Sequence, residues 1–407
     1  MISRRMGLTT AAATLLTGVA APRATATAPP SLRTTGTHED TGSRARLQRD
    51  VDTVLATGAT GVLAEAQTAD GRTTARAGLT DRSDPRRPVP WDAYYRIGSD
   101  TKTFTAVLVL QLAGEGRLAL TDTVERWLPG AVRGDGNDGR RITVANLLRQ
   151  TSGLNDYLAV SPDAADAFTP AGYRRSRFRS TAPEDQLKAA LAHPPLWLPN
   201  AERPERERRW GYSNTNYVVA GLIVERVTGH SWAQEIHDRI IEPLGLRHTL
   251  TPGTSPYVPA PTATAYTWFP DAGGPTDTTL AAGGGADGSL ISTTRDHGVF
   301  LRALMSGRLL PPAQLAAMKK TVAADDWITA PGVRYGLGIA WRPVAGSRDG
   351  IWFHGGTHLG TVSESGVTPD GARAATSATF GLRMGDPAQD AQDAAGRRLI
   401  DRALTDR

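Results

Sequence analysis

Strand-like patterns occur at both ends of this chain and are missing from its middle. Two alternating stretches, residues 62–68 and 73–79, flank Asp70-Gly71, which is a strong hairpin signal. Strand signals return after residue 288 in "GSLIST", "YGLGIAW", "GIWFHGG", "TVSESGV" and "AATSATF". The intervening stretch has long loops and helical periodicity. This order favours an α+β fold in which both chain ends build one sheet domain.

The helical signals set the remaining boundaries. Leu47, Val51 and Val54 fall on one helical face before the hairpin, and residues 388–405 close the chain with a helix. We predict a sheet domain from residues 46–124 and 285–407, with residues 125–284 as a mainly helical insertion. Residues 29–45 are rich in Pro, Thr, Gly and Ser, which predicts a flexible leader.

The first 28 residues are typical of a targeting segment. A basic start precedes a mildly apolar run from Gly7 to Ala21, and small residues suited to cleavage follow. "SRRMGL" is similar to a twin-arginine signal, which fits the weak, Thr-rich apolar core. We therefore expect a secreted protein, and the similarity implies the twin-arginine route as its export pathway.

Charge and composition limit the partners. The net charge is +5, but Arg4, Arg5 and Arg23 lie in the targeting segment, so the mature chain carries +2. No basic stripe with interleaved aromatic residues is present, so we expect no nucleic-acid partner. No later stretch has the ~18 apolar residues of a membrane span, so no stable membrane anchor is expected. The chain has no cysteine, which excludes thiol catalysis and Cys-ligated zinc; we expect no metal or cofactor.

Lysine is rare in this chain, and one lysine has an informative position. Of 46 basic residues only four are lysines, and Lys102 follows Ser99 by three residues at an expected helix start. Ser and Lys at this spacing lie on one helical face. A serine hydroxyl needs a neighbour that takes its proton. A lysine whose pKa falls by ~3 units from ~10.4 can do so, whereas arginine cannot.

Two further groups of residues suit the same chemistry. Tyr212-Ser213-Asn214 opens a second apolar helix, where the tyrosinate could relay a proton to a leaving group and the amide could bind a substrate amide and Lys102. His354-Gly355-Gly356-Thr357 follows the strand "GIWF", and its glycines allow close approach of a substrate backbone. The N–H groups of Thr357 and Ser99 would form an oxyanion hole. His358-Leu359-Gly360 is a second possible register for this motif, and we prefer the first.

Together these residues resemble the serine β-lactamase and penicillin-binding-protein superfamily. Its three signatures are, in order, Ser-x-x-Lys, Tyr-x-Asn and Lys/His-x-Gly. The likeness covers about residues 46–400 and includes "ITVANLLRQTSGLNDY", "YSNTNYVVAGLIVERVTGHSW" and "GSLISTTRDHGVFLRALMSGRLL". It implies a β-lactamase/transpeptidase-like fold, an antiparallel sheet flanked by helices with an all-helical insertion. The implied roles are an acylated nucleophile, a general base, and second and third motifs: Ser99, Lys102, Tyr212 with Asn214, and His354 with Gly356.

The chain also departs from the pattern of the superfamily. His354 resembles the soluble exported serine D-alanyl-D-alanine carboxypeptidases, which have His-Thr-Gly, but Gly355 replaces the Thr. Asp100 replaces a common Val and would bring a negative charge close to Ser99, raising the pKa of Lys102. A substrate ending in D-Ala carries a carboxylate, and Arg342 is the candidate cation for it.

Three functions remain open from the sequence. The first is a D-alanyl-D-alanine carboxypeptidase that acts on peptidoglycan stem peptides and is acylated by β-lactams. The second uses the same serine chemistry on a β-lactam, as in a class C-like β-lactamase, on a small ester, or on a D-amino-acid amide. The third is a non-catalytic module that binds β-lactams or peptidoglycan. The motifs are shared, so only the substrates and the deacylation rate separate the first two.

Overall fold

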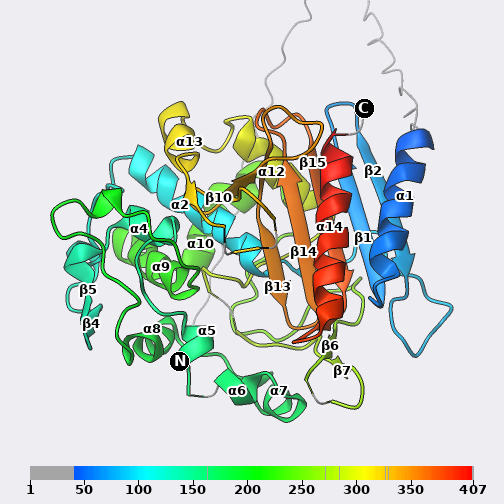
Figure 1. The fold of residues 1–407 in the computed structure, drawn as a ribbon, viewed down its shortest axis with the longest axis horizontal. Coiled ribbons are helices and arrows are strands. Elements are labelled where there is room, and N and C mark those ends of the chain that lie inside the picture. The colour runs from blue at the N-terminus through cyan, green and yellow to red at the C-terminus, as the bar shows by residue number, and fades with distance from the viewer. Residues whose placement is uncertain are drawn as a thin grey trace, which may run out of the picture. The chain divides into compact units, whose positions relative to one another are not determined.

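The hairpin around Asp70-Gly71 forms one edge of a nine-stranded sheet. β1 (Gly61–Gln67) pairs antiparallel with β2 (Arg72–Gly78) and, on its other side, with β15 (Ala374–Phe380) near the C-terminus (Figure 1). The two chain ends therefore share the sheet, and the α+β class is confirmed. The computed structural model describes residues 41–162, 164–270, 272–283, 285–325, 327–328 and 330–405.

The C-terminal strands complete the sheet in the order β2-β1-β15-β14-β12-β11-β10-β9. Their bounds are β14 Thr361–Val367, β12 Ile351–Phe353, β11 Ala340–Arg342, β10 Arg334–Tyr335 and β9 Val322–Ala323. β13 (Gly355–His358) pairs only with β14 among the described strands, so its other edge is open. "YGLGIAW" is not one strand, as predicted, because a turn with Gly338 at φ 76° divides it between β10 and β11.

Terminal helices cover one face of the sheet. α1 (Thr41–Leu55) and α14 (Pro387–Thr405) pack on each other and on the strands, and bury Val51 and Ile400 in one core cluster (Figure 1). The leader predicted for residues 29–45 is thus wrong for residues 41–45, which are helical. The signal peptide predicted for residues 1–28 and the rest of the leader lie outside the described residues.

The main core lies on the opposite face. α12 (Thr294–Met305) packs on β1, β14 and β15, and Phe300 on α12 stacks on Phe104 of α2 (Thr101–Gly114). α2 is buried along nearly its whole length, which explains its continuous apolar sequence. This burial fixes the N-terminus of α2 beside the open edge of β13.

Helices dominate residues 124–244. α9 (Thr215–Thr228) is the longest of them and ends at Gly229, whose φ of 79° suits a helix C-terminus. The others are α3 Val124–Trp127, α4 Val144–Leu148, α5 Tyr157–Val160, α6 Ala164–Ala167, α7 Pro170–Ser176, α8 Pro183–Leu191, α10 Trp232–Ile236 and α11 Glu242–Leu244, with the short turns η2 Gly139–Arg141, η3 Pro204–Arg206 and η4 His237–Ile241.

Short strands and one further helix connect these parts. They are β3 Tyr95–Arg96 paired with β8 Ile291–Ser292, β4 Arg133–Gly134 with β5 Asn137–Asp138, the three-stranded sheet β16 Leu382–Arg383, β6 Tyr266–Trp268 and β7 Thr276–Asp277, and α13 Pro312–Met318. "GSLIST" contributes only the two residues of β8. Within the described residues, none of the helices combines the length and apolar character needed to cross a bilayer.

Candidate active site

Ser99 lies in a short 3-10 turn, η1 (Gly98–Asp100), that leads directly into α2. The serine therefore sits at the positive end of a buried helix dipole. Gly98 has a φ of 53°, and a Cβ atom there would lie 2.6 Å from the carbonyl oxygen of Thr357. Glycine is required at this position because the turn approaches β13 so closely.

Lys102 lies one helical turn after Ser99, and its side chain is fully buried. Its Nζ is 3.0 Å from Ser99 Oγ, 2.6 Å from Asn214 Oδ1 and 2.6 Å from the main-chain oxygen of Asp287. A neutral amine has two hydrogens, which the two carbonyl oxygens accept. Its lone pair then faces the serine hydroxyl, which is the geometry of a general base.

Burial also moves the proton equilibrium of Lys102 in the required direction. Burial lowers the pKa of Lys102 to about 8, although the carboxylates of Asp287 and Asp156 act in the opposite sense. A pKa near 8 lies within reach of neutral pH, whereas the ordinary value of ~10.4 does not. This is the shift that the sequence required for a lysine base.

Tyr212 completes the contacts of the nucleophile. Its hydroxyl donates a hydrogen bond to Ser99 Oγ at 2.7 Å. Burial raises the pKa of Tyr212 above its ordinary value, so the phenol stays protonated. The tyrosinate considered from the sequence is therefore not supported. Tyr212 is instead a hydrogen-bond donor to the serine, and Lys102 is the group that can accept the serine proton.

Asn214 is held in one orientation by a residue outside the three motifs. Its Nδ2 donates to Asp156 Oδ2 at 2.8 Å, which turns Oδ1 toward Lys102. Asp156 begins α5 as its N-cap and accepts the N–H of Leu158. The sequence analysis did not single out Asp156, although it lies in the quoted stretch "TSGLNDY".

The third motif contributes main-chain atoms to the site. A Cβ atom on Gly356 would lie 1.8 Å from the oxygen of Ile97 and 3.0 Å from the nitrogen of Ser99. Only glycine fits there, and the close approach brings the strand of Thr357 against the turn of Ser99. Ser99 and Thr357 both line the same cavity. The register that begins at His354 therefore places its glycine against the nucleophile.

The imidazole of His354 is not on the cavity wall, as its predicted role in substrate binding requires. It is fully buried and is not among the residues that line the cavity. Nδ1 faces the oxygen of Gly355 at 2.6 Å and Nε2 faces the hydroxyl of Tyr335 at 3.0 Å. Burial lowers the pKa of His354 to about 3, so the ring is neutral and supports the strand from behind.

Arg342 is also misplaced in the sequence prediction. Its guanidinium forms an ion pair with Asp401 on α14, with Nη2 2.6 Å from Oδ1, and it is absent from the cavity lining. The strand position was correct, but the side chain points toward the terminal helix. Arg342 therefore does not face a substrate carboxylate.

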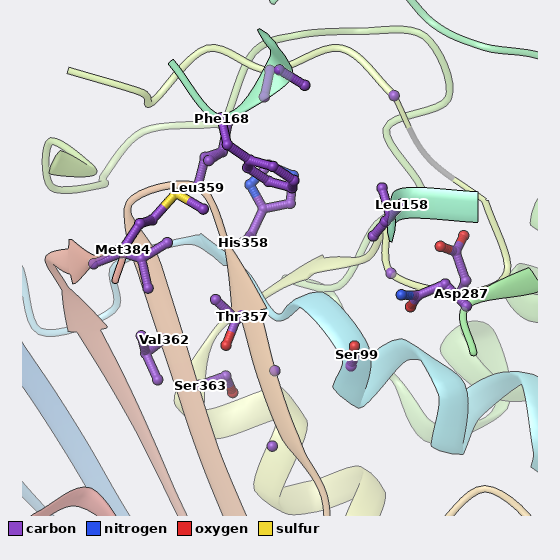
Figure 2. Close-up of a pocket in the computed structure, with 18 of the residues that line it drawn as sticks. Ser99, Leu158, Phe168, Asp287, Thr357, His358, Leu359, Val362, Ser363 and Met384 are labelled. Carbon is purple, nitrogen blue, oxygen red and sulfur yellow. The ribbon is translucent and has the colours of Figure 1, made fainter. Parts of the chain in front are cut away.

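The motif residues meet in a cavity of about 650 Å³. Figure 2 shows Ser99 at the start of its helix, with Thr357 and Ser363 on one side and Leu158 and Asp287 on the other. The remaining lining is mainly apolar and aromatic, with a few charged groups, which is typical of a small-molecule site. Charged lining residues include Arg177, Arg179, Asp287, Glu364, Asp393 and Arg397.

Sequence reasoning missed several other residues of this cavity. Trp327 stacks on Tyr212 with ring centroids 5.8 Å apart, and Tyr157 donates a hydrogen bond to Asp287 Oδ2 at 3.0 Å. Glu364 lies on β14 directly opposite Gly355. "TVSESGV" was predicted as a strand, but no local motif marks Glu364 as part of a site.

One possible cation-binding group occurs among the described residues. Ligand atoms of His237, Asp238 and Glu242 lie within 4.8 Å of one another, and all three residues are exposed. None of them lines the cavity of Ser99. The serine site itself is built from hydroxyl, amine, amide and main-chain groups.

Comparisons with known proteins agree with this geometry. The family described as Beta-lactamase matches residues 47–396. Protein flp of Staphylococcus aureus (strain MW2) is 34% identical over 155 residues, which are 38% of this chain and 27% of that protein. Penicillin-binding protein 4 of Amycolatopsis lactamdurans is 29% identical over 164 residues, 40% of this chain and 37% of that protein. The chain thus matches less than half the length of these relatives.

A solved structure matches far more completely. The D-stereospecific amidohydrolase from Streptomyces sp. is 37% identical, with a TM-score of 0.76, and the match covers 86% of this chain and 98% of that one. The resemblance inferred from the three motifs is confirmed, as is the β-lactamase/transpeptidase-like fold. With the family match extending over most of its length, the chain belongs to the beta-lactamase family.

Proposed function

We propose that this protein is a serine amidohydrolase that cleaves the amide bond after a D-amino-acid residue. Ser99 Oγ attacks the amide carbonyl as Lys102 takes the hydroxyl proton. The C–N bond then breaks, the amine leaves with a proton delivered through Lys102 and Tyr212, and an acyl-enzyme ester remains. Water hydrolyses this ester and regenerates the serine. The N–H groups of Ser99 and Thr357 bind the developing oxyanion.

The contact set of Lys102 carries this proposal. Two fixed carbonyl acceptors, on Asn214 and Asp287, leave a neutral amine only one direction for its lone pair, toward Ser99. The near-complete match to a D-stereospecific amidohydrolase supports the choice of substrate class. A purely binding module would not need a deprotonated lysine at the serine.

The groups near Gly355 differ from those expected of a carboxypeptidase. The Glu364 carboxyl lies beside this glycine, because a Cβ atom there would be 3.8 Å from Glu364 Oε2. Gly355 itself offers no hydroxyl, and Arg342 is paired with Asp401. Burial raises the pKa of Glu364 to about 8, so near neutral pH this group is mainly a neutral acid that becomes negative as the pH rises. A terminal carboxylate would therefore find this carboxyl group where the carboxypeptidases have a threonine.

A D-alanyl-D-alanine carboxypeptidase is the second candidate, and Arg397 is the observation that favours it. Arg397 lines the same cavity and attracts the nearby acids, since its charge lowers the pKa of Glu364 and of Asp393 against the effect of their burial. Burial nevertheless raises the pKa of both acids, that of Glu364 to about 8, so the charge of Arg397 remains available to a substrate carboxylate. We rank this activity below amide hydrolysis because the near-complete structural match is to a D-stereospecific amidohydrolase.

A matched substrate panel tests the proposal. We expect hydrolysis of D-alaninamide and D-phenylalaninamide. The kcat/KM for each L-isomer should be at least about 100-fold lower than the kcat/KM for the matching D-isomer. The panel also contains benzylpenicillin and a peptide that ends in D-Ala-D-Ala. The intact mass of the enzyme is followed over time with each compound. Hydrolysis of the peptide with no turnover of either amide would establish the carboxypeptidase instead. Rapid penicillin turnover would establish a β-lactamase.

The pH dependence of the reaction should report the deprotonation of Lys102. Because the neutral amine is the active form and its pKa is lowered to about 8, kcat/KM should rise with pH and level off above a midpoint near 8. The measurement is kcat/KM for an amide substrate between pH 6 and 10. A flat profile across this range would remove Lys102 from the role of general base.

Exchanging the groups at the third motif should change the substrate preference. A Cβ atom on Gly355 would meet Ser363 O at 3.6 Å and Glu364 Oε2 at 3.8 Å, which are ordinary contacts, so Gly355→Thr can be accommodated. Combined with Glu364→Gln, it should raise the ratio of kcat/KM for the D-Ala-D-Ala peptide over D-alaninamide about tenfold. Gly355→Ala with Glu364→Gln is the control, because it lacks the hydroxyl. If the kcat/KM ratio of peptide over amide stayed unchanged, Gly355 and Glu364 would not determine the choice of substrate.

Export of the enzyme is part of the proposal and rests on the sequence of residues 1–28. The mature protein would then act outside the cell, where D-amino-acid derivatives of the cell wall are available. N-terminal sequencing of protein recovered from the culture medium tests this, with cleavage expected after Ala21 or Ala28. Retention of the full-length chain inside the cell would contradict it.

A further inference from the structure

Asp100, the residue directly after the nucleophile, makes a contact that fixes its protonation state. Its side chain is 1% exposed and points away from the cavity, into the core between α2 and the sheet. Ser365 Oγ on β14 lies 2.8 Å from Asp100 Oδ1 and 2.7 Å from the main-chain oxygen of His354. We propose that Asp100 is a neutral carboxylic acid, whose proton links the nucleophile turn to the strand of the third motif.

Counting the hydrogens between these three oxygens leads to this assignment. A hydroxyl group has one hydrogen, and a main-chain carbonyl oxygen has none. The 2.7 Å contact with His354 therefore uses the hydrogen of Ser365, because two oxygens at this distance without a hydrogen repel each other. The 2.8 Å contact between Ser365 and Asp100 then needs a hydrogen of its own. Only the carboxyl group of Asp100 can supply it.

The charged and titratable groups around Asp100 agree with a neutral acid. His297 of α12 places Nε2 3.5 Å from Asp100 Oδ1, beyond a good hydrogen bond, and burial lowers the pKa of His297 to about 3. Lys102 directs its Nζ to Ser99 Oγ, to Asn214 Oδ1 and to the main-chain oxygen of Asp287 instead. Burial raises the pKa of Asp100 well above its ordinary value.

The other ionisable groups near Asp100 do not offset its burial. Burial is the largest influence on Asp100, and Glu364 of β14 raises the pKa of Asp100 further; the charge of Lys102 and the hydroxyl groups of Ser363 and Ser365 lower this pKa without offsetting the burial. Among the described residues, Asp100 Oδ2 has no hydrogen-bond partner. An ionised carboxylate would leave this oxygen charged and unpaired in the core, which is costly.

A neutral Asp100 does not have the effect expected from the sequence, where a negative charge beside Ser99 would raise the pKa of Lys102. A neutral acid places no negative charge beside Lys102, so the pKa of the lysine can fall. Asp100 is instead a positioning residue. It joins the turn of Ser99, through Ser365, to His354, which directly precedes the strand of Thr357, and so holds the two proposed oxyanion donors at a fixed separation.

Infrared difference spectroscopy tests the protonation state without any substrate. The spectrum of the parent protein minus that of Asp100→Asn, at pH 7.5, should contain the carbonyl stretch of a protonated carboxylic acid and no carboxylate bands. Asp81→Asn is the matched control, because hydrogen bonds, led by that from Ser83, lower the pKa of Asp81 to about 2, so its removal should take away carboxylate bands only. Carboxylate bands in the Asp100 difference spectrum would overturn the proposal.

Kinetics supply the second test and rest on the proposed amidohydrolase activity. Asp100→Asn keeps a donor for Ser365 and should retain most of the activity with an unchanged pH midpoint. Asp100→Ala and Ser365→Ala break the link and should lower kcat about 10- to 100-fold with little change in KM. If Asp100 were ionised, Asp100→Asn would remove a nearby negative charge and lower the midpoint by about one unit. Failure of every amide substrate would reject the proposed function but leave the infrared result to decide the state of Asp100.

Discussion

Ser99→Ala is expected to abolish amide hydrolysis, with kcat at least about 10³-fold below that of the parent enzyme. Ser99 Oγ is the atom on which Lys102 Nζ and the Tyr212 hydroxyl converge, at 3.0 and 2.7 Å. Without it, no covalent acyl-enzyme can form. The measurement is turnover of D-phenylalaninamide together with intact mass after mixing with benzylpenicillin, which should show no adduct.

The control for this variant is Ser213→Ala, which alters a buried serine next to Tyr212. Ser213 Oγ donates to the oxygen of Asn155 and does not contact Ser99. This variant should lose stability rather than chemistry, so its kcat should remain measurable. If Ser99→Ala kept hydrolysis or still formed a covalent adduct, another nucleophile would be at work and the proposed mechanism would be wrong.

Lys102→Arg is expected to lower kcat by about 10²- to 10⁴-fold although the positive charge is kept. Arginine has a pKa above ~12, so it cannot accept the serine proton at any pH at which the enzyme is folded. The rise of kcat/KM near pH 8 should vanish along with the activity. A pH series with D-phenylalaninamide, and thermal melting to verify folding, make the measurement.

Lys188→Arg is the matched control for this change, because Lys188 is an exposed lysine on α8. It should match the parent in both kcat and pH profile. Lys102→Met keeps an unbranched side chain but has neither a base nor a bulky guanidinium group. It should be as inactive as Lys102→Arg, which would show that loss of the base, and not the size of arginine, causes the loss of activity. Activity of Lys102→Arg within tenfold of the parent would rule out lysine as the base.

The fold was predictable from the sequence wherever periodicity and turns act locally. "TVSESGV" and "AATSATF" coincide with β14 and β15, because two short strand-like stretches on either side of a Pro-Asp-Gly turn are a local hairpin signal. "YGLGIAW" failed because its glycines allow a turn that alternation alone does not reveal. The prediction of a flexible leader was wrong at residues 41–45. There α1, which packs on α14, begins before the apolar residues that marked the helix in the sequence.

The same distinction between local patterns and long-range contacts applies to the residues of the site. Ser99 and Lys102 were identified because one helical turn brings them together, and that is a local property of the chain. Asp287 was missed because its hydrogen bond with Lys102 uses a main-chain oxygen, which any residue type can supply. Arg342 was assigned wrongly because its direction depends on Asp401, a partner on the terminal helix.

The sharing of one sheet between the two chain ends also affects when the enzyme can become active. Asp100 and Ser365, which contact each other, are separated by 265 positions in the sequence. The strands around Gly356 and Thr357 are thus synthesised long after the turn of Ser99. Until they pair, Ser99 lacks its partner N–H group, and contacts of such long range form slowly. A nascent chain that lacks these strands would carry the nucleophile and its base and still be inactive, so activity appears only after the strands have been made and have paired.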